Sequence, residues 1–401
     1  MLDVAIVGGG LCGLALAHSL QARGRDWRLF EARERLGGRV LTARASDGTP
    51  VDLGATWFWP ATQPAIARLV ADLGLASFEQ PDDGRVLHLS DPNRAPQTVA
   101  LTGQLAPADD PSVPARPGAV HGGARRVAGG IGAVIDALAR PLPTARLRTG
   151  QGLEGVVDHG DFVELRLRFG ATRYSVNARR VVFAMPPRVV DAGAQFSPAL
   201  APGLQAALRA TPTWMATAAK AGVAYSRAFW REAGHSGNAW VSHAQAMLAE
   251  VFDASGPEQG AALAGFCALG AAQRASFGRS RELLLSSQMA MLFGPGADDP
   301  ALRPEWFWQD WATEPQTCSP ADIAEEGLPV TGHTPHGDPL LAEGHWQGRL
   351  FFGGSETARQ GAGYLEGALA AAGRLRQQLL ADSLAALRPP QAANERLPAP
   401  G

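Results

Sequence analysis

The sequence lacks the features of several large protein classes. No segment of the 401 residues approaches the roughly 20 consecutive apolar residues of a membrane span, and the net charge of −2 suggests no nucleic-acid partner. The three cysteines (Cys12, Cys267 and Cys318) form neither a disulfide framework nor a metal-ligand spacing. The nine histidines show no metal-binding pattern. No serine-nucleophile motif is visible.

Lysine is almost absent. The chain has 36 lysines and arginines, and Lys220 is the only lysine among them. An ammonium group can lose its proton inside a protein, whereas a guanidinium cannot. Lys220 is therefore a candidate functional residue, with a chance surface lysine as the alternative. The first expected strand begins at Val4, which leaves no space for a signal peptide, and this predicts a cytoplasmic protein.

The first 30 residues predict one β-α-β unit. Residues 4–7 form an apolar run typical of a buried parallel strand, residues 14–20 have helical spacing, and residues 27–30 form a second strand. Between the first strand and the helix stands Gly8-Gly9-Gly10-Leu11-Cys12-Gly13, a Gly-x-Gly-x-x-Gly fingerprint. These glycines allow a tight turn, close approach of a pyrophosphate and helix–strand packing.

The residues that follow favour FAD over NAD. Glu31 ends the second strand, at the usual place for a carboxylate that binds a ribose. A second glycine pair with a cation, Gly37-Gly38-Arg39, comes shortly after it. Another close backbone approach and a positive charge beside the pyrophosphate are thus predicted.

The remaining pattern predicts an α/β fold. We expect a Rossmann-type FAD-binding domain with a mixed α+β substrate domain inserted in two pieces. The first would use residues 1–75, 125–196 and 340–385, the second 76–124 and 197–339, with a disordered tail at 386–401. The supporting elements are helices at 64–75 and 364–380, strands at 162–169, 181–184 and 349–352, and a loop at 90–122.

Several motifs together resemble the flavin monoamine oxidase family. They are the fingerprint with residues 31–39, Val51-Asp52-Leu53-Gly54-Ala55-Thr56-Trp57, residues 126–131 and 182–188, Lys220 with residues 229–237, and residues 348–358 with 363–368. The resemblance spans roughly residues 3 to 380. It implies FAD, an amine or amino-acid-like substrate, and O2 as the second substrate.

The resemblance also implies roles for particular residues. Lys220 matches a lysine bridged through water to flavin N5, and Tyr364 matches an aromatic residue in front of the flavin; we take both as catalytic. A helix starting near Tyr364 would point its positive end at the flavin. The implied cofactor-binding residues are Gly8, Gly10, Leu11, Cys12, Gly13, Glu31, Ala32, Arg33, Gly37, Gly38, Arg39, Thr56, Trp57, Leu153, Ala184, Met185, Trp311, Ser355, Glu356, Gly363, Tyr364 and Leu365.

The sequence departs from the family in one segment. The mitochondrial enzymes attach FAD to a Cys that follows Gly-Gly and precedes a Tyr, but residues 311–320 here contain Cys318 without that Gly-Gly or Tyr. Covalent attachment at Cys318 is therefore not expected. The second wall of the aromatic cage is left open between Trp57, Trp306 and Trp311. The family's C-terminal membrane helix is also missing.

The expected reaction is oxidation of an amine C–N bond to an imine, with hydride transfer to flavin N5 and reoxidation by O2 to give H2O2. One alternative is a C–C desaturase resembling phytoene desaturases or protoporphyrinogen oxidases. An amino-acid oxidase is another, and the many arginines do not single out a carboxylate partner. A non-catalytic flavoprotein is the third. The substrate and the oligomeric state stay open.

Overall fold

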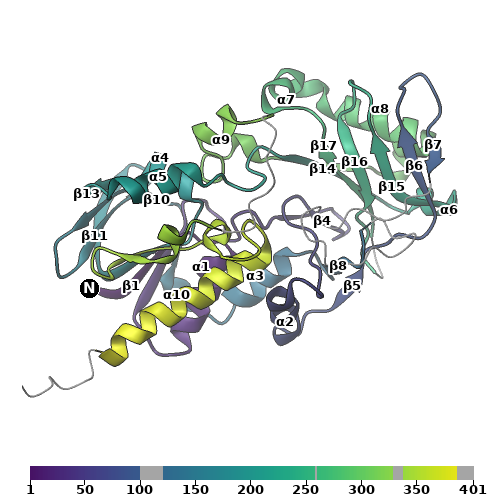
Figure 1. The fold of residues 1–401 in the computed structure, drawn as a ribbon. Helices are drawn as coiled ribbons and strands as arrows, with labels where there is room; N and C mark the ends of the chain where they lie inside the picture. The colour runs from purple at the N-terminus through teal and green to yellow at the C-terminus, as the bar shows by residue number, and fades with distance from the viewer. Residues whose placement is uncertain (100–120, 258–259, 328–336, 386–401) are drawn as a thin grey trace, which may run out of the picture.

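The computed structural model describes residues 1–99, 121–257, 260–327 and 337–385, and its two large β-sheets organise the chain (Figure 1). The first sheet has nine strands and the second has seven. Within the described residues, no helix combines the length and apolar character needed to cross a bilayer.

The first sheet contains the parallel unit expected from the N-terminal residues. Its strands are β1 (Leu2–Val7), β2 (Trp27–Phe30), β9 (Leu147–Arg148), β10 (Gln151–Asp158), β11 (Val163–Phe169), β12 (Thr172–Phe183), β13 (Gln195–Ser197), β19 (Gly344–His345) and β20 (Leu350–Phe352). Parallel pairing joins β2, β1, β12 and β20 in that order, with Val7 opposite both Phe30 and Phe183, and Phe183 opposite Phe352. The carboxyl ends of these four strands therefore meet at one edge.

Both faces of this sheet are covered. One face packs against α1 (Leu11–Gln21), α3 (Gly132–Ala139) and α10 (Leu365–Ala385), with α2 (Pro64–Asp72) beside α10. The other packs against α4 (Pro187–Gly193) and α5 (Pro202–Ala210). Alternate residues of β1 supply the two cores, because successive side chains of a strand point to opposite faces. This is the Rossmann-like arrangement that the first motif predicts.

The second sheet has the order β18-β14-β17-β16-β15-β6-β7. Its strands are β6 (Arg85–Leu89), β7 (Gln97–Val99), β14 (Ala219–Tyr225), β15 (His235–Val241), β16 (Leu248–Asp253), β17 (Ala261–Cys267) and β18 (Glu305–Asp310). One face packs on α8 (Arg281–Phe293) and α6 (Phe229–Glu232), with Val223 and Leu263 in the shared core. The side chains of the opposite face, among them Lys220 and Phe266, point toward the first sheet's edge.

Short elements complete the chain. They are β3 (Thr42–Arg44), β4 (Pro50–Asp52), β5 (Ser77–Glu79), β8 (Arg125–Val127), α7 (Ala271–Phe277), α9 (Pro320–Ala324) and single 3-10 turns at Thr144–Arg146, Gly278–Ser280, Pro295–Asp298, Pro300–Leu302, Trp311–Thr313, Pro339–Ala342 and Ser355–Thr357. Among the described residues, the first sheet takes its strands from 2–30, 147–197 and 344–352, and the second takes its strands from 85–99 and 219–310. The domain boundaries themselves stay a prediction.

Two local expectations need correction. The first helix begins at Leu11 rather than Leu14, because the fingerprint's last residues already have helical geometry. The prediction of a loop at 90–122 is wrong at β7, which pairs antiparallel with β6. The hydrogen bonds of β7 come from this pairing, and the loop-like composition of the segment gave no sign of it. Residues 100–120 of that segment and the predicted tail 386–401 lie outside the described residues.

Candidate functional site

A cavity of about 750 Å³ lies between the carboxyl edge of the first sheet and the inner face of the second. Its lining includes Gly8 after β1, Glu31 after β2, Ala184 after β12 and Gly354 after β20. Open α/β sheets bind ligands at this edge. The second sheet contributes Lys220, Glu250 and Phe266 to the opposite wall.

The fingerprint borders the cavity through Gly10. A methyl group added there would meet only the Gly37 carbonyl oxygen, at 3.9 Å, so the space before Gly10 is open. At Gly13, by contrast, an added methyl would lie 2.0 Å from the Gly8 carbonyl oxygen. The first backbone N–H groups of α1 have no intrahelical partner, which makes this end of the cavity suitable for phosphates.

Glu31 is fixed at the same end. Its carboxylate accepts hydrogen bonds from the backbone N–H groups of Gly9 (2.7 Å) and Arg33 (2.9 Å), and the residue is 4% exposed. Each oxygen retains a lone pair, so the group can also accept from hydroxyls.

Arg39 and Glu356 connect two motifs that are 317 residues apart. The guanidinium donates to both carboxylate oxygens, at 2.6 and 3.0 Å, and also to Ser355 Oγ at 3.1 Å. Burial raises the pKa of Glu356, but the charge and hydrogen bonds of Arg39 outweigh it and leave the pKa below its usual value. The pair therefore joins the segment after Gly38 to the segment after β20 as a charged clamp.

Lys220 lies on β14 with its ammonium group buried against the cavity. Nζ donates to the Gly54 carbonyl oxygen at 2.8 Å and to Thr56 Oγ1 at 2.5 Å, and the residue is 3% exposed. The ring centroids of Phe266 and Trp57 lie 4.6 and 5.3 Å from Nζ. Burial lowers the pKa of Lys220 to about 7, so the side chain exchanges its proton near neutrality.

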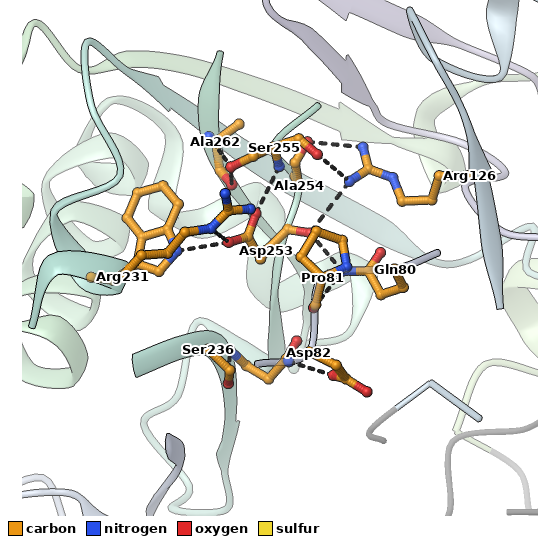
Figure 2. A network of polar contacts seen from close by, with 12 residues as sticks. Gln80, Pro81, Asp82, Arg126, Arg231, Ser236, Asp253, Ala254, Ser255 and Ala262 are labelled. Carbon is orange, nitrogen blue, oxygen red and sulfur yellow. Dashed lines mark hydrogen bonds and ion pairs between the residues drawn. The ribbon is translucent and has the colours of Figure 1, made fainter. Parts of the chain in front are cut away.

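A buried polar network holds Trp57. Figure 2 shows Gln80 beside Asp253, where the Gln80 amide donates to the Asp253 carbonyl oxygen at 2.7 Å. The Gln80 side-chain oxygen accepts from Trp57 Nε1 at 2.8 Å. Arg126 donates to the carbonyl oxygens of residues 253–255 in the same network. The indole beside Lys220 is thus oriented from the second sheet.

Two models of known protein families match this chain. A family model described as flavin containing amine oxidoreductase matches residues 115–378, more than half of the chain. The chain belongs to the flavin-containing amine oxidoreductase family. A second model, NAD(P)-binding Rossmann-like domain, matches residues 6–73. The cofactor that the family holds is FAD.

Individual relatives match in different ways. Amine oxidase [flavin-containing] B of Sus scrofa is 26% identical over 94% of this chain and 86% of that protein. The enzyme of the same name from Homo sapiens is 41% identical, but over only 21% of this chain and 16% of its own length. The structure of putrescine oxidase bound to putrescine has 19% identity and a TM-score of 0.71, with 95% and 99% of the two chains covered. Cyclohexylamine oxidase from Brevibacterium oxydans IH-35A has 18% identity and a TM-score of 0.73, with 96% and 100% covered. The two structures share the fold.

The cavity of this family member fits FAD at its dinucleotide end. The open space before Gly10, the unpaired N–H groups of α1 and the oriented Glu31 carboxylate match what a pyrophosphate and a ribose need. The start of α10 at Leu365 also lines the cavity, as the resemblance implies for the flavin end.

Most residues singled out from the sequence lie around this one cavity. Every residue taken as catalytic or cofactor-binding lines it except Gly13 and Glu356, which support it from behind. Gly13 packs against the Gly8 turn, and Glu356 holds Arg39. Cys12 lines it too, but its sulfur accepts from the Gly354 N–H at 3.3 Å, and burial raises the pKa of its thiol to about 11. The roles of all these expected site residues toward FAD stay predictions.

The aromatic residues at the cavity include Trp214, which the three candidates for the second cage wall did not name. Tyr364 lies next to Trp214, with ring centroids 5.8 Å apart and planes at 51°. Trp57 and Trp311 line the cavity, whereas Trp306 does not. Trp214 follows a Pro-Thr segment between α5 and β14, and no sequence pattern marked it. Cys318 is absent from the lining, and burial raises the pKa of its thiol to about 12.

Other lining residues also escaped the sequence. His121, Glu250, Phe266 and Gln63 face the cavity from four separate segments. No local pattern marks Glu250, because a bulge between Leu248 and Glu250 shifts the strand register, so Leu248 packs in the core against α8 while Glu250 faces the cavity.

The low pKa of Lys220 makes the stability of the fold depend on pH. The unfolded lysine titrates near 10.5 and the folded one near 7, so between these values the unfolded state binds more protons. We expect the free energy of unfolding of the wild type, relative to Lys220→Met, to rise with pH in this window by about 1.4 kcal/mol per pH unit. Urea unfolding of both proteins at several pH values measures the difference, and a pH-independent difference would contradict the burial argument.

Proposed function

We propose that the chain oxidises the C–N bond of a primary or secondary amine to an imine. The observation that carries the proposal is Lys220, a buried lysine bonded to Gly54 and Thr56 in an aromatic cavity that also includes the dinucleotide end. When bound, FAD supplies the chemistry by accepting a hydride equivalent and passing the electrons to O2, which yields H2O2. The similar structures are named for oxidation of putrescine and cyclohexylamine, which supports an amine substrate.

The chain's own residues then have separate tasks. Tyr364 and Trp214 lie side by side in the cavity lining, and aromatic rings favour an amine next to them. Lys220, held by Gly54 and Thr56, positions water and moves a proton at Nζ. The apolar walls exclude bulk water from the reacting nitrogen.

FAD is held without a covalent bond in this proposal. Cys318 does not line the cavity, and its thiol pKa of about 12 leaves almost no thiolate to react. We expect acid denaturation of the purified yellow protein to leave all of the flavin in the supernatant. Flavin that stays with the precipitate would contradict non-covalent binding.

The test of the function is the visible flavin spectrum under anaerobic conditions, recorded before and after addition of primary amines, secondary amines and amino acids. Bleaching by amines, followed by recovery and peroxide release on admission of air, is the expected result. Bound flavin that no amine bleaches would overturn the proposal in favour of a C–C desaturase or a non-catalytic flavoprotein. Flavin that stays bleached in air and recovers only when an artificial electron acceptor is added would indicate a dehydrogenase.

A further inference from the structure

A carboxylate and an imidazole meet on the cavity wall, apart from the groups assigned above. Glu250 lies on β16, and its Oε1 is 3.4 Å from Nε2 of His121. The His121 ring stacks on Trp57 with centroids 4.7 Å apart and an interplanar angle of 26°. Both Glu250 and His121 line the cavity, and Asp82 lies behind His121, 4.0 Å from Nδ1.

The hydrogen bonding of His121 is incomplete. The residue is 2% exposed, yet neither ring nitrogen has a hydrogen-bond partner within the described part of the chain. Buried polar atoms are normally paired, so such a gap requires an explanation. Asp82 is not free to move closer to His121, because its carboxylate accepts a hydrogen bond from Asn238 Nδ2 at 2.8 Å. The group nearest to Nε2 is the Glu250 carboxylate at 3.4 Å, so the ring backs the carboxylate that faces the cavity.

The strand register sets the distance between this pair and Lys220. Phe266 on β17 is opposite Lys220 of β14 on one side and opposite Glu250 of β16 on the other. The three residues form a cross-strand row on the inner face of the sheet. Since neighbouring strands are about 4.8 Å apart, the backbones at Lys220 and Glu250 are separated by about 10 Å. The two polar groups thus mark separate points along one wall.

The charges at the two points differ. Oxidation next to nitrogen needs a neutral amine with its lone pair free, and Lys220, which loses its proton near neutrality, suits that end. Of the described residues, only Glu31 and Glu250 bring carboxylates to the lining, and Glu31 stands at the dinucleotide end. A carboxylate such as Glu250 stabilises a cation and would hold an amine in its protonated, unreactive form.

We infer that Glu250 and His121 form a subsite for a second, protonated amino group of the substrate, so that the preferred substrates are diamines. The inference rests on the proposed function for the oxidation itself. The ammonium donates to the Glu250 carboxylate, which His121 backs at 3.4 Å, and the aromatic face of Trp57 borders the chain between the two amines.

The experiment compares pairs of amines that differ only in the second cation. Each α,ω-diamine of four to eight carbons is matched with the monoamine in which a methyl group replaces one ammonium, such as 1,5-diaminopentane and hexylamine. The flavin reduction rate is followed anaerobically in the wild type, in Glu250→Gln and in Glu282→Gln. Glu282 is an exposed carboxylate on α8 that does not line the cavity, and its variant is the matched control. Flavin content shows that each variant is folded.

We expect the wild type to use the best diamine about tenfold or more efficiently than its matched monoamine. Glu250→Gln should remove that preference through KM, with the monoamine unchanged, and Glu282→Gln should retain it. Equal use of both amines by the wild type, or an equal loss for both in Glu250→Gln, would overturn the subsite.

A second readout separates this subsite from the proposed oxidation. Binding of the same amine pairs is measured by calorimetry on holoenzyme whose flavin has been chemically reduced, so that no turnover occurs. A diamine preference that depends on Glu250, without flavin reduction by any amine, would uphold the subsite and overturn the oxidase function. Flavin reduction by amines without a binding preference for diamines would uphold the oxidase function and overturn the subsite.

Discussion

Lys220→Met is expected to lower the rate of amine-driven flavin reduction or of reoxidation by about 100-fold, the scale of a positioned proton-transfer group. The methionine keeps the apolar stem between Trp57 and Phe266 but cannot bond to Gly54 or Thr56. Rapid-mixing measurements of the two half-reactions assign the loss to one of them. Lys220 makes no contact with Glu31 or with the start of α1, so bound FAD should remain.

The control for this substitution is Arg179→Met, which removes a cation whose side chain is 65% exposed and should leave both half-reactions unchanged. Lys220→Arg adds a second comparison, since the guanidinium retains the charge but cannot lose its proton. If Lys220→Met reduced and reoxidised the flavin at wild-type rates, the catalytic role of the only lysine would be wrong.

Gly10→Ala is expected to leave the apoprotein folded and to weaken FAD binding by about tenfold or more. The backbone at Gly10 has φ −76° and ψ −176°, which any residue adopts, and the added methyl would meet only one protein atom, at 3.9 Å. The same methyl would project into the space that a pyrophosphate needs. Thermal unfolding of the apoprotein and FAD titration measure the two effects separately.

The matched substitution is Gly13→Ala. Its methyl would lie 2.0 Å from the Gly8 carbonyl oxygen, so the turn itself must deform and the apoprotein should lose stability as well. Normal FAD affinity in Gly10→Ala would show that the cofactor does not pass in front of Gly10.

Local signals in the sequence predicted the elements that position the cofactor. Strand β1, the fingerprint, α1 and Glu31 follow one another within 31 residues, and their periodicity and glycine spacing report backbone geometry directly. The strict alternation of residues 163–169 likewise predicted β11. The amino-acid composition alone singled out Lys220, because it is the only lysine in the sequence. Its match to a family motif then supplied a role that composition alone could not.

The Rossmann-like unit and the identity of the cofactor could therefore be read from the sequence, and a role for Lys220 could be predicted from it. Only the tertiary structure decided that Trp214 faces Tyr364, that Gln80 orients Trp57 and that His121 meets Glu250. The physical reason is the separation of these partners along the chain. Each residue sits in a segment whose local pattern specifies only a strand or a loop, and the contact arises when the second sheet closes over the edge of the first.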